Sequence, residues 1–116
     1  MSALRVLVSG GRDYTDRNHL RAELDRVVKK HGRIHIISGG ATGADTLALE
    51  WAKDRCMPRT IYPAEWTHRG PSAGPIRNQE MIDDGKPDLF VPFPGGPGTA
   101  DMTNRATVAG IRFWQP

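Results

Sequence analysis

Three pairs of adjacent glycines each follow an apolar stretch of the chain, and these turns hold the residues best placed to do chemistry. They are Gly10-Gly11 after residues 4–9, Gly39-Gly40 after residues 34–38, and Gly95-Gly96 after residues 88–93. Glycine lets the backbone approach a ligand closely, and the first amides of a following helix have no partner of their own. Three such turns predict a site for phosphate or another anion.

The third turn is the most prominent, because it reads Pro94-Gly95-Gly96-Pro97-Gly98-Thr99. It lies between the apolar residues 89–93 and a helix-like segment at residues 100–109. A strand that ends in a glycine-rich turn and leads into a helix is suited to binding an anion at the helix N-terminus. We therefore expect an anion at this turn.

Arg77 and Asn78 follow Ile76, where the sequence predicts the start of a helix that ends near Gly85. A cation in the first turn of a helix opposes the helix dipole, so local stability does not explain Arg77. A bound anion would explain it, and we take Arg77 as a site residue. An ordinary surface ion pair is the alternative.

Asp45 lies in the first turn of the helix predicted after Gly43. Its carboxylate either complements the helix dipole or accepts a hydrogen bond from a ribose hydroxyl, as acidic groups do in dinucleotide sites. The sequence leaves both interpretations open.

Regular elements must bring these turns together. Residues 4–9 are apolar without polar alternation, which is typical of a parallel strand covered on both faces. Strands alternate with helices along the chain, and this predicts an α/β, Rossmann-like three-layer sandwich with a parallel sheet of about five strands. Right-handed crossovers favour the order 3-2-1-4-5, in which the winding reverses between strands 1 and 4. The strands are expected at residues 4–9, 34–38, 60–62, 88–93 and 111–114.

In that strand order the three glycine turns converge on the crevice at the carboxyl ends of the strands, where ligands bind in open α/β sheets. The turns do not contain a Walker A loop or the G-x-G-x-x-G dinucleotide fingerprint. No Cys/His spacing suggests zinc, so we expect neither a metal nor a cofactor.

The totals for the chain set further bounds. Its 116 residues predict one domain, and no apolar run approaches the roughly 20 residues needed to span a bilayer. With one cysteine, Cys56, and no signal peptide, we expect a cytoplasmic protein. The net charge of +3 rests on scattered arginines, which favours an anionic ligand and does not favour nucleic acid.

Two segments suggest partners. Residues 64–75 form a loop without a periodic pattern, and its Trp66, His68 and Arg69 offer a stacking and phosphate-contacting patch for single-stranded DNA. We rank this reading below a small-molecule ligand, because the positive charge is diffuse. Phe113 and Trp114 have little chain after them to cover them, so we expect a homodimer contact there.

Four motifs together resemble a known group of proteins. The turn at residues 94–99 looks like the P-G-G-x-G-T signature of the SLOG superfamily, which includes the lysine-decarboxylase-like LOG proteins. Residues 8–14, 38–45 and 73–81 resemble its small YspA and cpYpsA-related branch. The resemblance covers nearly the whole chain. It implies a Rossmann-like fold that binds nucleotides or nucleotide-derived ligands, and relatives of this superfamily commonly dimerise.

The resemblance also implies a chemistry and a departure from it. LOG relatives cleave the N-glycosidic bond of nucleoside 5′-monophosphates, using the glutamate of P-G-G-x-G-T-x-x-E and an arginine of the preceding helix. Arg77 matches that arginine, but Met102 stands at the glutamate position and Asp101 lies one residue earlier. Adjacent helical residues point about 100° apart, so Asp101 is not expected to do the same work in the same place.

We therefore expect a sensor or binding protein for a nucleoside monophosphate, ADP-ribose or an NAD derivative. A phosphoribohydrolase-like N-glycosidase with Arg77 and Asp101 as catalytic residues is the alternative enzyme hypothesis. The expected ligand-binding residues are Ser9, Gly10, Gly11, Arg12, Asp13, Ser38, Gly39, Gly40, Thr42, Gly43, Asp45, Arg77, Asn78, Pro94, Gly95, Gly96, Gly98 and Thr99.

Overall fold

The computed structural model of the protein describes residues 3–64 and 70–114, which form a parallel sheet between two pairs of helices. The strands are ordered β3-β2-β1-β4-β5, and every neighbouring pair is parallel. This confirms the predicted fold class and strand order. The strands are β1 (Leu4–Ser9), β2 (Ile34–Ser38), β3 (Arg59–Ile61), β4 (Leu89–Pro92) and β5 (Arg112–Phe113).

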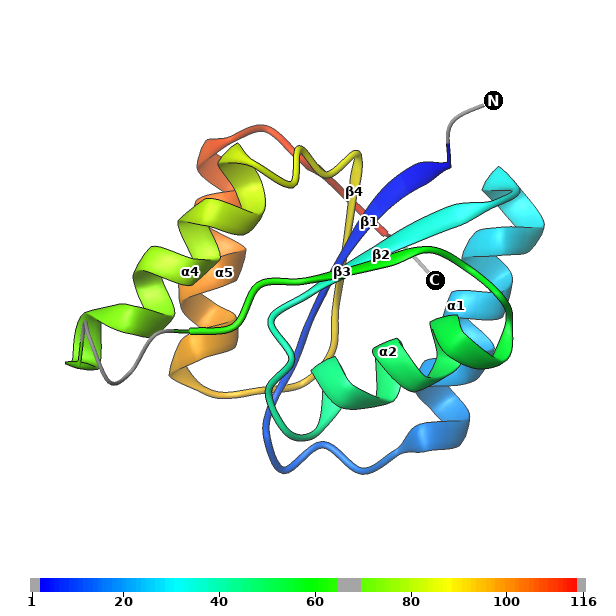
Figure 1. Cartoon of the computed structure of the whole chain (residues 1–116), viewed down its shortest axis with the longest axis horizontal. Coiled ribbons are helices and arrows are strands. Elements are labelled where there is room, and N and C mark those ends of the chain that lie inside the picture. Colours follow the sequence, from blue (N-terminus) through cyan, green and yellow to red (C-terminus); the bar gives the residue numbers. More distant parts are fainter. Residues whose placement is uncertain (1–2, 65–69, 115–116) are drawn as a thin grey trace.

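The helices cover the two faces of the sheet in pairs (Figure 1). Helices α1 (Arg17–His31) and α2 (Ala44–Asp54) pack together on one face. Helices α4 (Ala73–Asp83) and α5 (Pro97–Val108) pack together on the other, and a short 3-10 turn at Gly70–Ser72 precedes α4. The chain changes face after β3, so the winding reverses between β1 and β4 as expected.

The side chains of each inner strand alternate between the two helix pairs. Val6 and Val8 of β1 belong to the core under α1 and α2, whereas Leu7 belongs to the core under α4 and α5 with Phe90 of β4. Both cores are fully buried at these positions. Burial on both faces explains why the inner strands are apolar without polar alternation.

The ends of α1 follow the predicted signals. The Asp16 carboxylate accepts a hydrogen bond from the His19 amide at 3.1 Å and caps the helix. Gly32 ends it with φ at 84°, and its amide donates to the Val28 carbonyl at 2.7 Å. Strand β2 begins two residues later, at Ile34.

Two helices start about one turn earlier than the sequence suggested. Helix α4 starts at Ala73 rather than Ile76, and α5 starts at Pro97 rather than at residue 100. Proline fits the first turn of a helix, where its missing N–H has no intrahelical acceptor to lose. Arg77 therefore lies in the second turn of α4. Arg77 was wrongly predicted to oppose the helix dipole from the first turn.

The last strand is shorter than predicted, and the chain itself covers part of the aromatic residues Phe113 and Trp114. Phe113 packs edge-on against Phe90, with ring centroids 5.1 Å apart. The Trp114 indole nitrogen donates to Glu23 Oε2 at 2.9 Å, and Lys30 Nζ lies 5.7 Å from the centre of that ring. These contacts cover part of both side chains, and the homodimer contact at these two residues stays a prediction.

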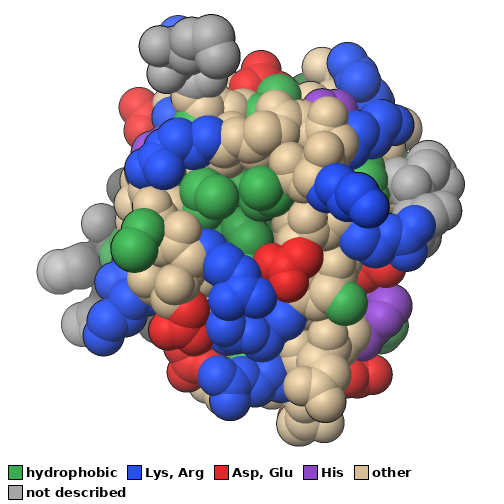
Figure 2. Space-filling view, turned by 90° about the vertical axis from the view of Figure 1, so that its right-hand side faces the viewer, with side chains coloured by type: hydrophobic (Ala, Val, Ile, Leu, Met, Phe, Trp, Pro, Cys, Tyr) green, Lys and Arg blue, Asp and Glu red, His purple; other side chains and the backbone are tan. Residues whose placement is uncertain are grey.

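Charges of both signs are spread over the face shown in Figure 2, where Lys and Arg side chains form several groups with Asp and Glu side chains between them. No helix in the described residues is long and apolar enough to cross a membrane. Trp66, His68 and Arg69, which the sequence offered as a DNA-contacting patch, lie outside the described residues.

Candidate functional site

A cavity of about 1010 Å³ lies where the loops after β1 and β4 meet the starts of α4 and α5. This is the point where the winding of the sheet reverses, and its size suits a small-molecule site. Most of the residues predicted from the sequence line it: Ser9, Gly10, Gly11, Arg12, Asp13, Asp45, Arg77, Asn78, Pro94, Gly95, Gly96, Gly98, Thr99 and Asp101.

Two of the three glycine turns touch each other at the floor of this cavity. The Gly11 amide donates to the Pro94 carbonyl at 2.8 Å. A Cβ atom on Gly11 would lie 3.0 Å from the Gly95 Cα, and one on Gly95 would lie 2.6 Å from the Gly11 nitrogen. Glycine is therefore needed at both positions because two backbones cross there, whether or not a ligand is bound.

The N-terminus of α5 faces the cavity without a side-chain cap. Its cap residue, Gly96, makes no capping side-chain bond, and Pro97 follows in the first turn. An added Cβ on Gly96 or Gly98 would meet no atom of the described residues within 4 Å. The amides of Gly98 and Thr99 lie in the first turn, where helix geometry provides no acceptor. These amides and the helix dipole suit an anion.

The N-terminus of α2 differs, because the protein itself satisfies two of its amides. The Ala44 amide donates to the Gly11 carbonyl at 3.3 Å, and the Thr46 amide donates to the Ala41 carbonyl at 3.1 Å. Gly43, with φ at 88°, lets the α2 N-terminus approach the loop after β1. At the α5 start Gly96, Pro97, Gly98 and Thr99 all line the cavity, whereas at the α2 start Asp45 is the first-turn residue that does so.

Arg77 covers the remaining glycine turn. Its Nη1 donates to the Gly39 carbonyl at 3.1 Å and to the Tyr62 carbonyl at 3.4 Å. A Cβ on Gly39 would overlap the guanidinium, so glycine there makes room for Arg77. The predicted residues between β2 and α2, with the last residue of β2, are not among the cavity's lining residues: Ser38, Gly39, Gly40, Thr42 and Gly43. Ser38 instead donates to the Asp45 carbonyl at 3.3 Å.

Asp45 reaches the cavity wall although it is 7% exposed. Its Oδ2 accepts a hydrogen bond from the Ala41 amide at 3.3 Å. Burial raises the pKa of Asp45 to about 6, against the opposing effects of the Ala41 hydrogen bond and the positive charges of Arg77 and Arg12. A buried carboxylate with this pKa changes its charge close to neutral pH.

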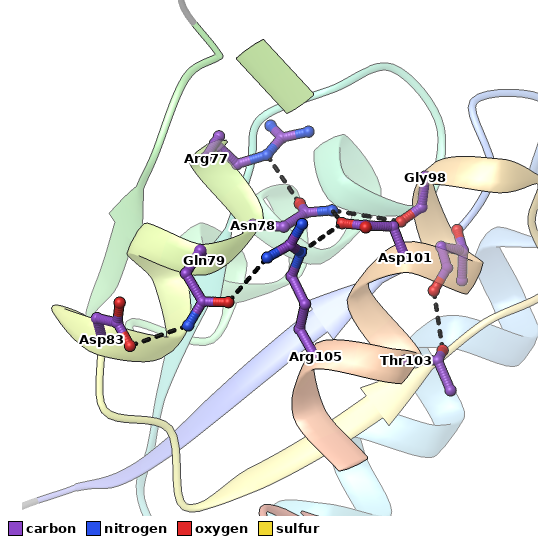
Figure 3. A network of polar contacts seen from close by, with 9 residues as sticks. Arg77, Asn78, Gln79, Asp83, Gly98, Asp101, Thr103 and Arg105 are labelled. Atoms are coloured by element: carbon purple, nitrogen blue, oxygen red, sulfur yellow. Dashed lines mark hydrogen bonds and ion pairs between the residues drawn. The ribbon is translucent and has the colours of Figure 1, made fainter. Parts of the chain in front are cut away.

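Asn78 connects the two residues that the sequence paired as catalytic. Its Oδ1 accepts from Arg77 Nε at 3.1 Å, and its Nδ2 donates to Asp101 Oδ2 at 2.9 Å (Figure 3). Arg105 Nε donates to the same Asp101 oxygen at 2.8 Å. Burial alone would raise the pKa of Asp101, but the hydrogen bonds from Arg105 and Asn78 outweigh it and lower the pKa. Asp101 is therefore a carboxylate at neutral pH.

Met102, at the position of the LOG glutamate, is fully buried. It packs in the core under α4 and α5 with Leu7 and Phe90, and it is not among the cavity's lining residues. An ionised side chain there would be buried among apolar groups. Of this adjacent pair, Asp101 is the residue that reaches the cavity.

Several lining residues were not predicted. Tyr14, whose ring centre is 5.4 Å from that of Phe93, lines the cavity with its neighbours in the loop after β1. Tyr14 and these neighbours follow a strand that ends in Gly-Gly, and that position could have indicated that they line the cavity. Arg105 was also missed, although its i, i+4 spacing from Asp101 is a standard ion-pair signal. The unpredicted lining residues are Val8, Tyr14, Thr15, Asp16, Ala41, Pro71, Gly74, Pro75, Met81 and Pro97.

Solved structures with the same fold include several different proteins. TM1055 matches with a TM-score of 0.72 and 19% identity, covering 95% of this chain and 72% of that one. DNA processing protein A from Streptococcus pneumoniae has a TM-score of 0.72 and 16% identity. This chain is 96% covered in that match but spans 49% of that protein. The Moco carrier protein of Chlamydomonas reinhardtii has a TM-score of 0.67 and 20% identity, covering 97% of this chain and 74% of its own.

Sequence comparison places the chain more narrowly. The Gene 61 protein of Mycobacterium phage D29 is 33% identical over 115 residues, covering 92% of this chain and 91% of the phage protein. The model of the YspA, cpYpsA-related SLOG family matches residues 4–68, which include the first glycine turn, the Gly39-Gly40 turn and Asp45. The chain belongs to the YspA, cpYpsA-related SLOG family.

Proposed function

We propose that this protein binds a nucleotide or nucleotide-derived ligand in the cavity between the turns after β1 and β4, as a binding protein or sensor. A nucleoside monophosphate, ADP-ribose and an NAD derivative are the ligands considered. The observation that carries the proposal is the uncapped N-terminus of α5, which opens into a cavity large enough for such a ligand at the switch point of the sheet.

The ligand's phosphate belongs at Gly98 and Thr99, because amides of the first turn of α5 are the anion-binding groups on this wall. Arg12 lines the same cavity and adds positive charge. Asp45 and Asp101 line other parts of the wall, where a carboxylate suits hydroxyl or amino groups better than a phosphate. This division of charge matches a ligand with one anionic end and one end rich in hydrogen-bond donors.

A carrier function is consistent with the fold. The Moco carrier protein has, by its name, a small-molecule cargo, and it shares this fold at 20% identity. Such a likeness supports only the fold, so the choice of a nucleotide depends on the family and on the cavity. Membership of the YspA, cpYpsA-related SLOG family is the main support for choosing a nucleotide as the ligand.

N-glycosidase activity is the second candidate, and one observation favours it. Arg77 and Asp101 both line the cavity and are joined through the Asn78 amide. If Asp101 stabilises an oxocarbenium-like state or positions water, Asp101→Asn should abolish release of base from AMP. Unchanged release in that variant would remove Asp101 from the mechanism.

Single-stranded DNA binding has less support. The described part of the chain shows no block of basic residues, and the aromatic and basic patch predicted at residues 66–69 lies outside it. The likeness to DNA processing protein A is a likeness of fold at 16% identity. An oligonucleotide titration at two salt concentrations tests this reading, since phosphate contacts weaken steeply with salt.

The ligand is identified by a thermal-shift panel of AMP, CMP, ADP-ribose, NAD and ribose 5-phosphate, followed by titration calorimetry. A ligand at 100 times its dissociation constant adds about 2.7 kcal/mol to the free energy of unfolding. For a domain of this size we expect Tm to rise by roughly 10 °C. No shift with any of these ligands would contradict the proposal.

Two substitutions at one position then test where the phosphate binds. Gly98→Asp adds a carboxylate to the first turn of α5, which favours the helix dipole but repels an anion. We expect undiminished stability and at least about tenfold weaker binding. Gly98→Ala is the matched control, because its methyl group enters open space. Unchanged affinity in Gly98→Asp would place the phosphate elsewhere, whereas equal loss in both variants would show that added bulk rather than charge weakens binding.

A further inference from the structure

A network of polar side chains joins α4 to α5 beside the cavity, and the proposed function does not use all of it. We call Asn78, Gln79 and Asp83 of α4 with Asp101 and Arg105 of α5 the α4–α5 network (Figure 3). Asn78 and Asp101 line the cavity, whereas the other three side chains do not. The network therefore connects the cavity wall to the outer surface of these helices.

Within the described residues, the side chains that donate to Asp101 do so at one oxygen. Asn78 Nδ2 and Arg105 Nε reach Oδ2 at 2.9 and 2.8 Å. The second oxygen, Oδ1, receives no hydrogen bond from the described residues. The Asp101 side chain is 31% exposed and lines the cavity. One carboxylate oxygen is thus saturated by the protein while the other has capacity for a donor.

Arg105 is itself held from the opposite side. Its Nη1 donates to Gln79 Oε1 at 2.9 Å, and Gln79 Nε2 donates to Asp83 Oδ1 at 3.0 Å. An arginine anchored at both ends loses little freedom when it binds a carboxylate. It fixes the rotation of the Asp101 side chain and so the direction of Oδ1.

The position of Asp101 on α5 defines what Oδ1 can meet. Asp101 follows Gly98 by three residues, which is about 4.5 Å along the helix axis. A phosphate at the Gly98 amide brings the attached sugar close to Asp101. A carboxylate repels a second phosphate, but it accepts hydrogen bonds from sugar hydroxyls.

We propose that Asp101 Oδ1 accepts a hydrogen bond from a ribose hydroxyl of the ligand, and that Arg105 is the positioning residue for this contact. The inference rests on the proposed nucleotide site and adds a specificity to it: the site prefers ribose over deoxyribose. A site built around a carboxylate acceptor rejects an analogue that lacks the donor, because the acceptor then loses its partner. Since Asp101 is partly exposed, the expected preference is moderate, about tenfold.

The experiment measures dissociation constants by calorimetry for AMP and CMP and for their 2′-deoxy and 3′-deoxy analogues. With the wild-type protein, we expect one deoxy analogue to bind about tenfold more weakly than its parent nucleotide. The measured quantity is the ratio of the dissociation constant of the deoxy analogue to that of its parent nucleotide. In Arg105→Met this ratio falls toward one, because the parent nucleotide loses affinity while the weaker analogue keeps its affinity. Arg105→Lys, which retains the charge and a donor, should restore part of the ratio.

Arg112→Met is the matched control, because Arg112 is an exposed arginine of β5 that does not line the cavity. It should leave the ratio unchanged, and thermal unfolding checks that each variant is folded. If AMP or CMP binds but both deoxy analogues bind equally well, the inference fails and the nucleotide site stands. If Arg105→Met weakens parent and analogue equally, Arg105 has no positioning role. If neither AMP nor CMP binds, the same comparison uses the ligand found in the thermal-shift panel and its deoxy analogues. If no ligand of the panel binds, the proposed function fails together with the inference.

The pH dependence of the ratio separates positioning from a purely structural role. The contact needs an ionised Asp101, so the ratio should fall as pH decreases through the pKa of this carboxyl group. Arg105 lowers that pKa, so in Arg105→Met the fall should occur at a higher pH. Arg77 and Asn78 of α4 face this region in both proteins, and Asp45 titrates in both. The difference between the two profiles therefore reports the effect of Arg105 on Asp101.

Discussion

Glycines of the same sequence motif have different physical roles in this site. Gly11 and Gly95 allow two turns to cross, and Gly39 makes room for the Arg77 guanidinium. Gly96 and Gly98 face open space, so packing does not require them. The sequence identified these positions as special but could not assign each role, because the role depends on which backbone crosses nearby. The two glycines without packing neighbours are the ones for which a ligand is the best explanation.

Asp45 is a second residue whose role depends on burial that the sequence does not reveal. We predict that Asp45→Asn is more stable than the wild type at pH 8 by about 1–3 kcal/mol, because the native carboxylate has a pKa near 6 against 3.8 for an ordinary Asp. Between about pH 4 and pH 6 the native state holds this proton more tightly than the unfolded chain. The wild type therefore loses stability as pH rises through that window. Urea unfolding from pH 4 to pH 8 measures both proteins.

Asp25 is the control for this prediction, because its carboxylate is expected to affect stability in the opposite direction. Hydrogen bonds from Arg55 and, more weakly, from Trp51 outweigh burial and lower the pKa of Asp25. Its contribution to stability is therefore present at neutral pH and lost as pH falls through its native pKa. Asp25→Asn should be less stable than the wild type at pH 8. If Asp45→Asn is also less stable at pH 8, burial of the Asp45 carboxylate does not destabilise the native state.

At the scale of the element, most of the fold followed from hydrophobic patterns and end signals. Residues 4–9 and 34–38 were predicted as strands with the bounds that the structure gives, because buried parallel strands have a clear apolar pattern. The starts of α4 and α5 were missed by about one turn, because Pro75 and Pro97 resemble loop residues when read in sequence. Their helical conformation becomes clear only when the first turn is seen.

Because the turns after β1 and β4 cross, we can predict how substitutions at this point change stability. Gly95→Ala should lower the free energy of unfolding by about 1–3 kcal/mol, because its methyl group would overlap Thr99 and approach the Gly11 nitrogen at 2.6 Å. Gly98→Ala, three residues later, should be as stable as the wild type or more stable, since alanine favours the helix. Chemical denaturation distinguishes them. Equal stability of all three proteins would show that the turns separate without loss.

At the scale of the whole molecule, residues 113 and 114 at the end of the described chain contact both cores. Phe113 packs on Phe90 under α4 and α5, whereas Trp114 packs on the other core and donates to Glu23 of α1. Residues that are distant in the sequence are therefore held together across the sheet. A pattern-based prediction sees two exposed aromatics at the end of a chain and suggests a partner. The structure supplies their contacts from within.

The contacts of Trp114 within the chain lead to a prediction about stability and oligomeric state. Trp114→Ala should lower the free energy of unfolding by about 2 kcal/mol, less than for a fully buried tryptophan, because Trp114 is partly exposed. Trp114→Phe should lower it by about 1 kcal/mol, since the ring packing is kept and the hydrogen bond to Glu23 is lost. Light scattering after size exclusion should give one mass for all three proteins. A mass that halves in Trp114→Ala while stability stays constant would instead support the homodimer contact at this strand.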